Sequence, residues 1–501
     1  MNLSRSGPRR LLVLAGVLSI VAAACGSSTT STAPSAAASA SQAAAASAAP
    51  IVTPTPVIVT PEPIPAGPGP NGGVVVRWFV GLGAGTQPAH LGPEKAWVDA
   101  YNASQKEVYL SLEIVDNSIA AGNLKTQIAA GNAPDIIGPV GIEGLNLFRD
   151  QLLDLAPLVT SSGYTQPGVD PKLTEFFKIG EGGSQIGLPF AVYPSYIFYN
   201  QELFDEAKLP YPPTKIGDMY EGKPWDMEAV RQLGMKLTVD KNGNDATSPD
   251  FDPTAIEQWG FDVQYHDGSA RAETAMFGAG SPVADDGKTA QIPQYIADGE
   301  KWFHDGIWKD HFIPNANQVA STLLNAGGEF ASGNLAMNHG HTWFTCCVTP
   351  TAPAKPFKFG FAAAPSFNGT LTAPLHVDTF SILKSTKVSD SAFKALTAMV
   401  ESVELLTIYG AMPADPAKQQ AWFDSINANF PGITLDWSIP QASLAYPDIP
   451  NNQSYVPNYA EAKAAFQAFQ TKVRTTEALD VAAELDILKT TLQGIFDKPA
   501  N

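Results

Sequence analysis

The chain has 501 residues, 44% of them hydrophobic and 16% charged, and its formal net charge is −18 at pH 7. This length is enough for two globular domains, and the acidic balance disfavours nucleic acid and anionic lipid as partners. The charge says little about a neutral ligand.

Residues 1–24 have the pattern of a secretory signal. Three arginines precede an apolar run from Leu11 to Ala24, which ends in small residues. Cys25 follows directly and resembles the lipobox cysteine of bacterial lipoproteins, which is lipidated and becomes the new N-terminus. We therefore expect an exported protein that lipidated Cys25 anchors to the outer face of the cytoplasmic membrane. An ordinary cleaved signal is the alternative.

Residues 25–73 consist almost wholly of Ala, Ser, Thr, Pro and Gly. Such a segment has too few large apolar groups to offset the entropy lost on ordering, so we expect a tether without a fold of its own. Its proline-rich half, Pro50 to Pro70, favours extended conformations that hold the folded part away from the membrane.

The folded part begins near Val74 and alternates strand and helix patterns. Residues 74–80 and 108–115 fit strands, residues 93–102 and 123–130 fit helices, and another strand opens at Asp135. This βαβαβ order predicts an α/β fold with a mostly parallel sheet, whose ligands lie at the carboxyl ends of the strands.

Three helices are expected near the C-terminal end. Residues 392–406 and 460–473 carry apolar stripes at helical spacing, and a final stripe contains Leu485, Leu488 and Leu492. These stripes indicate core-facing helix surfaces.

Cys346 and Cys347 are adjacent, and they are the cysteines that remain once Cys25 is lipidated. An oxidising compartment favours a bridge between them. Neighbouring Cα atoms lie about 3.8 Å apart, below the usual disulfide range of about 4.4 to 6.8 Å, so a vicinal disulfide would be strained. Two free thiols are the alternative.

Oxygen-bearing side chains alternate at Asp240, Asn242 and Asn244, as in calcium-binding loops. The segment departs from the EF-hand pattern at the positions of its glycine and its last glutamate. An Asx-rich turn explains the same residues, so calcium and a plain turn both stay open. No other cofactor is indicated. His339 and His341 alternate without an evident third metal ligand and are expected in a cleft or on the surface.

Several motifs, in chain order, resemble those of one family. They are AGNAPDI (130–136), GLPFAVYPSYIFYN (187–200), FASGNLAM (330–337) and TEAL (476–479). The chain resembles extracellular solute-binding proteins of sugar-importing ABC transporters, the group that includes maltose-binding protein. The resemblance spans nearly all of the chain from Val74 onward.

The resemblance implies two α/β lobes joined by several crossover strands, with the ligand in the cleft between them. Lobe one would contain residues 74–188 and 380–435, and lobe two residues 195–375 and 440–501. In such proteins the lobes close on a sugar, and the closed form docks on a membrane permease. We therefore expect a monomeric receptor, not an enzyme, that leaves its ligand chemically unaltered.

Sugar binding requires aromatic rings that stack on sugar rings and polar groups that replace water on the hydroxyls. Trp343 is the leading stacking candidate, with a core role as the alternative. Asp378 can accept hydrogen bonds from two hydroxyls or orient the hinge. Of two tyrosines at the crossover, Tyr193 is preferred to Tyr196. The other expected cleft residues are Thr86, Gln87, Asn452 and Tyr455.

Two other classes of function share these features. An exported glycoside hydrolase would use the same aromatic platform, together with two carboxylates across the scissile bond. A receptor for a polyamine or peptide would use the acidic residues of the cleft. The aromatic candidates favour carbohydrate.

Overall fold

The computed structural model describes residues 58–59, 67–166, 168–178, 183–264, 275–325, 328–346, 348, 356–451 and 453–499. These residues belong to one compact unit, Thr55–Asn501. The predicted signal, Cys25, Cys347 and Asn452 lie outside the described residues, and so does the side chain of Cys346. Among the helices that are described, none has the length and hydropathy needed to cross a bilayer.

The expected βαβαβ unit is present at the N-terminal side of the sheet. β2 (Val74–Val80) pairs in parallel with both β3 (Val108–Val115) and β4 (Ile136–Val140), and α1 (Pro88–Ser104) and α2 (Asn117–Ala129) connect these strands. The mixed α/β fold class is therefore confirmed.

Both connecting helices begin earlier than the sequence pattern predicts. Proline is compatible with the first turn of a helix, and α1 begins at Pro88. α2 begins at Asn117, because the Asp116 carboxylate accepts a hydrogen bond from the Ser118 amide at 3.0 Å and so caps the helix.

Two long strands carry the sheet from its first half into its second. β14 (Leu375–Ile382) pairs with β4 through its last residues and with β5 (Ala191–Asn200) through its first, antiparallel in both cases. The sheet then continues through β10 (Leu335–His341), β9 (Ile256–Val263) and β8 (Val239–Asp240). β5 and β14 lie where the resemblance places crossovers, and the limits of the two lobes remain a prediction.

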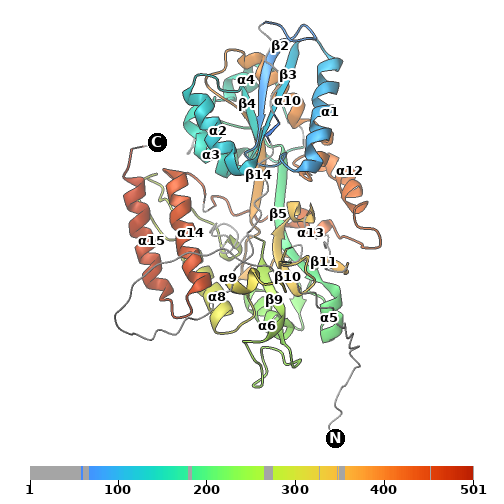
Figure 1. The fold of residues 1–501 in the computed structure, drawn as a ribbon, viewed down its shortest axis with the longest axis vertical. Coiled ribbons are helices and arrows are strands. Elements are labelled where there is room, and N and C mark those ends of the chain that lie inside the picture. Colours follow the sequence, from blue (N-terminus) through green and yellow to red (C-terminus); the bar gives the residue numbers. More distant parts are fainter. Residues whose placement is uncertain are drawn as a thin grey trace, which may run out of the picture. The chain divides into compact units, whose positions relative to one another are not determined.

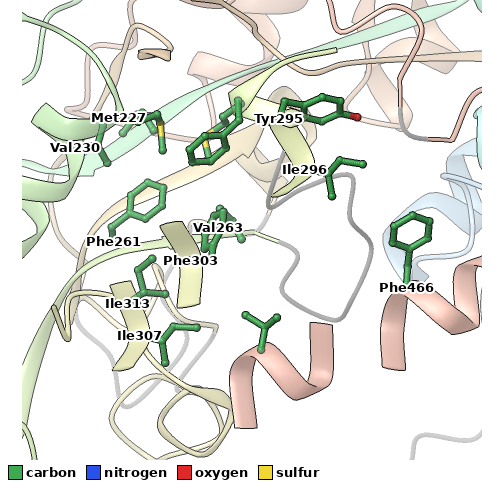
Figure 2. Close-up of a cluster of buried hydrophobic side chains, with 14 of the residues drawn as sticks. Met227, Val230, Phe261, Val263, Tyr295, Ile296, Phe303, Ile307, Ile313 and Phe466 are labelled. Atoms are coloured by element: carbon green, nitrogen blue, oxygen red, sulfur yellow. The ribbon is translucent and has the colours of Figure 1, made fainter. Parts of the chain in front are cut away.

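A large apolar core supports the second half of the sheet. α6 (Met227–Leu237), α8 (Gln294–Trp308), α14 (Tyr459–Thr475) and α15 (Val481–Phe496) contribute to this core, and α14 and α15 pack on one another (Figure 1). Figure 2 shows Phe261 and Phe303 among its side chains. The two C-terminal helices predicted from apolar stripes are confirmed.

The expected helix at 392–406 is two helices, α10 (Ser389–Val400) and α11 (Val403–Ile408). The hydroxyl of Ser402 accepts a hydrogen bond from the Leu405 amide at 3.1 Å, so this residue starts a new helix.

The remaining helical segments are short, except for α12. They are α3 (Ile142–Phe148), η1 (Arg149–Gln151), α4 (Ala156–Ser162), η2 (Pro171–Phe177), α5 (Gln201–Ala207), η3 (Ala275–Phe277), α9 (Ala316–Val319), η4 (Thr342–Cys346), α12 (Pro416–Asn427) and α13 (Ser438–Ser443). The remaining strands are β6 (Met219–Tyr220), β7 (Lys223–Pro224), β11 (Phe359–Ala362), β12 (Ser366–Phe367), β13 (Thr370–Leu371) and β15 (Met412–Pro413).

Part of the segment that was expected to lack a fold contacts the sheet. β1 (Ile58–Val59) pairs antiparallel with the last residues of β3. The Asn71 side-chain amide donates to the carbonyl groups of Asn102, Gln105 and Val108, at 3.0, 3.1 and 2.9 Å. The chain is thus attached to the turn between α1 and β3 before β2 begins.

Candidate functional site

Three residues selected from the sequence meet where β5 and β14 cross between the two halves of the sheet. The ring of Tyr193 on β5 lies 4.9 Å, between centroids, from the ring of Trp343 in η4. The Tyr193 hydroxyl donates to Asp378 Oδ2 on β14 at 3.4 Å. Segments far apart in sequence therefore bring two aromatic rings and a carboxylate together.

Two histidines complete this group. His341, at the end of β10, stacks on Trp343 with a centroid distance of 4.4 Å and an interplanar angle of 21°. His376 lies 4.6 Å from the ring of His341 and 4.9 Å from that of Trp343. We call Tyr193, His341, Trp343, His376 and Asp378 the crossover cluster.

Trp343 is held in place from a further strand. Its indole Nε1 donates to Gln264 Oε1 at 2.7 Å, directly after β9. Trp343 and Asp378 are half-buried, whereas Tyr193, His341 and His376 are buried. The partly exposed groups of the cluster are therefore one indole side chain and one carboxylate, and buried rings support them.

A glycine at the end of β4 makes room for Asp378. A Cβ atom built on Gly141 would lie 2.8 Å from Asp378 Oδ1, too close for an ordinary contact. Any larger residue at this position would displace the carboxylate. The absence of a side chain at Gly141 therefore allows the Asp378 carboxylate to lie against the end of β4.

Sequence reasoning missed His376 and Gln264 as members of this site. A signal for His376 exists, because it lies two residues before Asp378 on one strand and therefore shares its face. No sequence pattern marks Gln264, which directly follows β9. The pairing of β9 with β10 brings its side chain to Trp343.

Tyr196 lies on the opposite face of β5 from Tyr193, as expected for strand residues three apart. It is buried against the rings of Phe198 and Phe361, at 4.8 and 4.6 Å between centroids. Burial raises the pKa of its hydroxyl well above the ordinary value. Tyr196 is thus placed in the core, and Tyr193 is the tyrosine that joins the cluster.

His339 is also a core residue and not a surface group. It is buried on β10, and desolvation lowers its pKa to about 3. It is therefore neutral at physiological pH. The expectation of a cleft or surface position is wrong for His339, and His341 is the histidine of this pair that reaches the cluster.

Thr86, Gln87 and Tyr455 take part in none of the contacts described above for the crossover cluster. Thr86 is half-buried, and Gln87 is exposed at the start of α1 without a side-chain capping bond. Tyr455 has a left-handed backbone, with φ of 64°, and lines a small pocket with Ile142 and Arg149. Their roles in binding stay predictions.

The acidic loop at residues 240–244 uses its carboxylate for backbone hydrogen bonds. Asp240 Oδ1 accepts from the amides of Asn242 and Asn244 at 2.8 and 3.0 Å, and Oδ2 accepts from the Asp252 amide at 2.9 Å. Burial alone would raise the pKa of Asp240, but these donors lower it to about 2. Among the described residues, no group of three His, Cys, Asp or Glu side chains is arranged to hold a metal ion.

We expect calcium to leave the unfolding temperature unchanged, because the oxygens of Asp240 already accept amide hydrogen bonds. Thermal unfolding with a chelator and with millimolar calcium tests this expectation. A rise in unfolding temperature that calcium causes in the wild type, and that Asp240→Asn abolishes, would show instead that the loop binds the ion.

Comparisons with known proteins agree with the fold. The family model of bacterial extracellular solute-binding proteins matches residues 96–421, which is more than half of the chain. A search of curated proteins gives no match. The chain belongs to the bacterial extracellular solute-binding proteins, a family of exported binding proteins.

Alignments with solved structures of this fold cover most of the chain. UspC of Mycobacterium tuberculosis is 19% identical with a TM-score of 0.62, and the alignment covers 84% of this chain and 100% of that one. The sugar-binding protein MalE of Xanthomonas citri is 15% identical with a TM-score of 0.64, covering 84% and 97%. The cyclic alpha-maltosyl-1,6-maltose binding protein of Arthrobacter globiformis is 20% identical with a TM-score of 0.60, covering 85% and 99%. These similarities confirm the two-lobed fold.

Proposed function

We propose that this protein is the receptor of an ABC importer for a sugar or oligosaccharide. The observation that carries the proposal is that Trp343, Tyr193 and Asp378 lie together where β5 pairs with β14. In a two-lobed binding protein, residues at the crossover strands contact both the ligand and the hinge, so this position couples binding to closure.

The chemistry of the crossover cluster suits a carbohydrate. An indole ring held by a stacked histidine and by Gln264 offers a rigid apolar surface, as the C–H face of a sugar ring requires. Asp378 adds a carboxylate that accepts hydrogen bonds from hydroxyl groups. The names of the similar structures support the same class, because the Xanthomonas citri and Arthrobacter globiformis proteins are described as binding sugars.

The proposal includes the mode of attachment and the fate of the ligand. Lipidated Cys25 holds the receptor at the outer face of the cytoplasmic membrane, and the tether that precedes β1 allows the folded part to reach the permease. The ligand is released chemically unaltered, and the folded part acts as a monomer. Mass spectrometry of the membrane-extracted protein tests the lipid directly, since an unmodified N-terminus at residue 25 contradicts it.

A thermal-shift screen tests the ligand class. Mono- and oligosaccharides, a polyamine and short peptides are each added to the folded part at increasing concentration. We expect one group of saccharides to raise the unfolding temperature with a saturable dependence, because a ligand that binds the folded state alone stabilises it by about 2.7 kcal/mol at one hundred times its Kd. Stabilisation by the polyamine or peptides and by no saccharide would contradict the sugar assignment.

A further inference from the structure

A buried glutamate lies behind the glycine-rich loop at residues 81–87. Glu94 on α1 is 0% exposed, and the hydroxyl of Tyr409 is the hydrogen-bonding group beside its carboxylate. Nδ1 of His90, on the same helix, is buried with no hydrogen-bond partner. Carboxyl groups are seldom fully buried, so a glutamate enclosed next to a tyrosine and a histidine requires an explanation.

These side chains are in contact with the loop and with each other. A Cβ atom built on Gly85 would lie 2.6 Å from Glu94 Oε1 and 3.4 Å from Tyr409 Cε1, so the loop backbone rests directly on both side chains. Gly85 has φ of 108°, a conformation that suits glycine. His90 lies one helical turn before Glu94, and its ring is 6.1 Å from that of Tyr409.

The same group reaches the strand that carries Tyr193. The ring of Tyr409 packs against Phe190, directly before β5, at 6.3 Å between centroids. On the other side of the loop, a Cβ atom on Gly83 would lie 2.5 Å from the Pro139 carbonyl oxygen of β4. The loop is therefore enclosed between Glu94 and the strand ends that border the crossover cluster.

The surroundings of Glu94 favour its neutral form. The titratable groups that face it are His90 of α1, Tyr409 after α11 and, through Tyr409, Tyr193 of β5. Burial lowers the pKa of His90 and raises that of Tyr409, so both are neutral near pH 7. The loop contains no titratable side chain.

Burial raises the pKa of Glu94 to about 8, and the nearby Tyr409 hydroxyl opposes this rise. A carboxylate without a compensating cation is costly to bury, whereas a carboxylic acid has an O–H group that can donate to the loop and a carbonyl oxygen that can accept from the Tyr409 hydroxyl.

We propose that Glu94 is a positioning residue. In its neutral carboxylic acid form it holds the loop at residues 81–87 and the ring of Tyr409 in place next to the crossover cluster. Ligand affinity therefore depends on whether Glu94 is protonated. The expected effect of Glu94 on ligand affinity rests on the proposed function. Its effect on stability and on loop dynamics does not depend on the identity of the ligand.

The direction of the pH effect follows from the raised pKa. Between the ordinary glutamate pKa and about 8, the folded state keeps a proton that the unfolded state has lost. The contribution of Glu94 to stability is therefore complete in acid and declines as pH rises through this range. Glu94→Gln keeps a neutral side chain of similar shape and removes the titration.

The first experiment uses no ligand. Unfolding temperature and amide hydrogen exchange of residues 81–87, corrected for intrinsic rate, are measured from pH 5 to pH 9. We expect the difference in unfolding temperature between Glu94→Gln and wild type to grow with pH, and the loop of the wild type to lose protection near pH 8. Parallel profiles for the two proteins would overturn the proposal.

Tyr409→Phe provides a second variant if Glu94→Gln fails to fold. It keeps the ring against Phe190 and removes the hydroxyl that lowers the pKa of Glu94. We expect its loss of loop protection to occur at higher pH than in the wild type. A shift to lower pH, or no shift, would contradict the proposed arrangement.

The second experiment measures affinity with maltotriose as the probe. If the protonated form alone binds, the apparent Kd at pH 9 is about tenfold weaker than at pH 7, because about one molecule in eleven then carries the proton. Glu94→Gln should bind with one affinity at both pH values. An equal tenfold loss in both proteins would overturn the link to Glu94, whereas failure of maltotriose to bind at all would concern the proposed ligand and leave the first experiment decisive.

Discussion

Replacing Trp343 by alanine is expected to weaken sugar binding by about 1 to 3 kcal/mol while the fold survives. The indole is half-buried, its Nε1 is bound by Gln264, and one face is covered by His341. These contacts place the ring rigidly before the ligand arrives, so little conformational entropy is lost on binding. Truncation removes both the stacking surface and this preorganisation.

Calorimetry with the best saccharide of the thermal-shift screen measures this loss. Trp308→Ala is a matched control, because Trp308 packs on α14, where its indole donates to the Val473 carbonyl at 2.9 Å. The control should lower stability and leave affinity unchanged. If Trp343→Ala retains wild-type affinity and a native circular dichroism spectrum, Trp343 is not a ligand contact.

Replacing Arg474 by methionine is expected to destabilise the fold by about 3 to 5 kcal/mol. Arg474 on α14 and Asp262 on β9 form an ion pair at 3.1 Å, and their side chains are 3% and 0% exposed. Arg474 also donates to the Pro314 carbonyl at 3.2 Å. Removing the guanidinium leaves the Asp262 charge buried without its partner, which costs more than the ion pair itself contributes.

Urea unfolding of the single and double variants separates these two costs. Arg474→Met combined with Asp262→Leu should recover much of the lost stability, because no charge is then left buried. The exposed pair of Lys301 and Asp305 offers a control, since Lys301→Ala should cost about 0.5 kcal/mol or less. A loss below 1 kcal/mol in Arg474→Met would mean that water reaches Asp262 and that this core is more open than the structure shows.

Much of the fold follows from local patterns. The strands around residues 74–80 and 108–115 and the C-terminal apolar stripes are predicted correctly, because period-two and period-3.6 patterns reflect burial on one face. The start of α2 was missed because it depends on a cap at Asp116 and not on an apolar pattern. The division between α10 and α11 depends likewise on Ser402.

The site was predicted in part, for a physical reason. Tyr193 lies on a strand that one family motif locates, Asp378 lies where the resemblance places a crossover, and Trp343 follows a strand that another motif locates. The supporting residues could not be found this way, since Gln264 and Trp343 meet through the pairing of β9 with β10. Glu94 was missed for the same reason, because its neighbour Tyr409 lies far along the chain.

Proton NMR of a saccharide during titration with the protein tests the central claim most directly, because one spectrum reports both binding and cleavage. The account predicts saturable broadening of the sugar signals at one site per chain, with anomeric signals that stay unchanged over a day of incubation. New reducing-end signals would show an enzyme, and sharp, unshifted signals for every saccharide of the screen would show that the crossover cluster does not bind sugar.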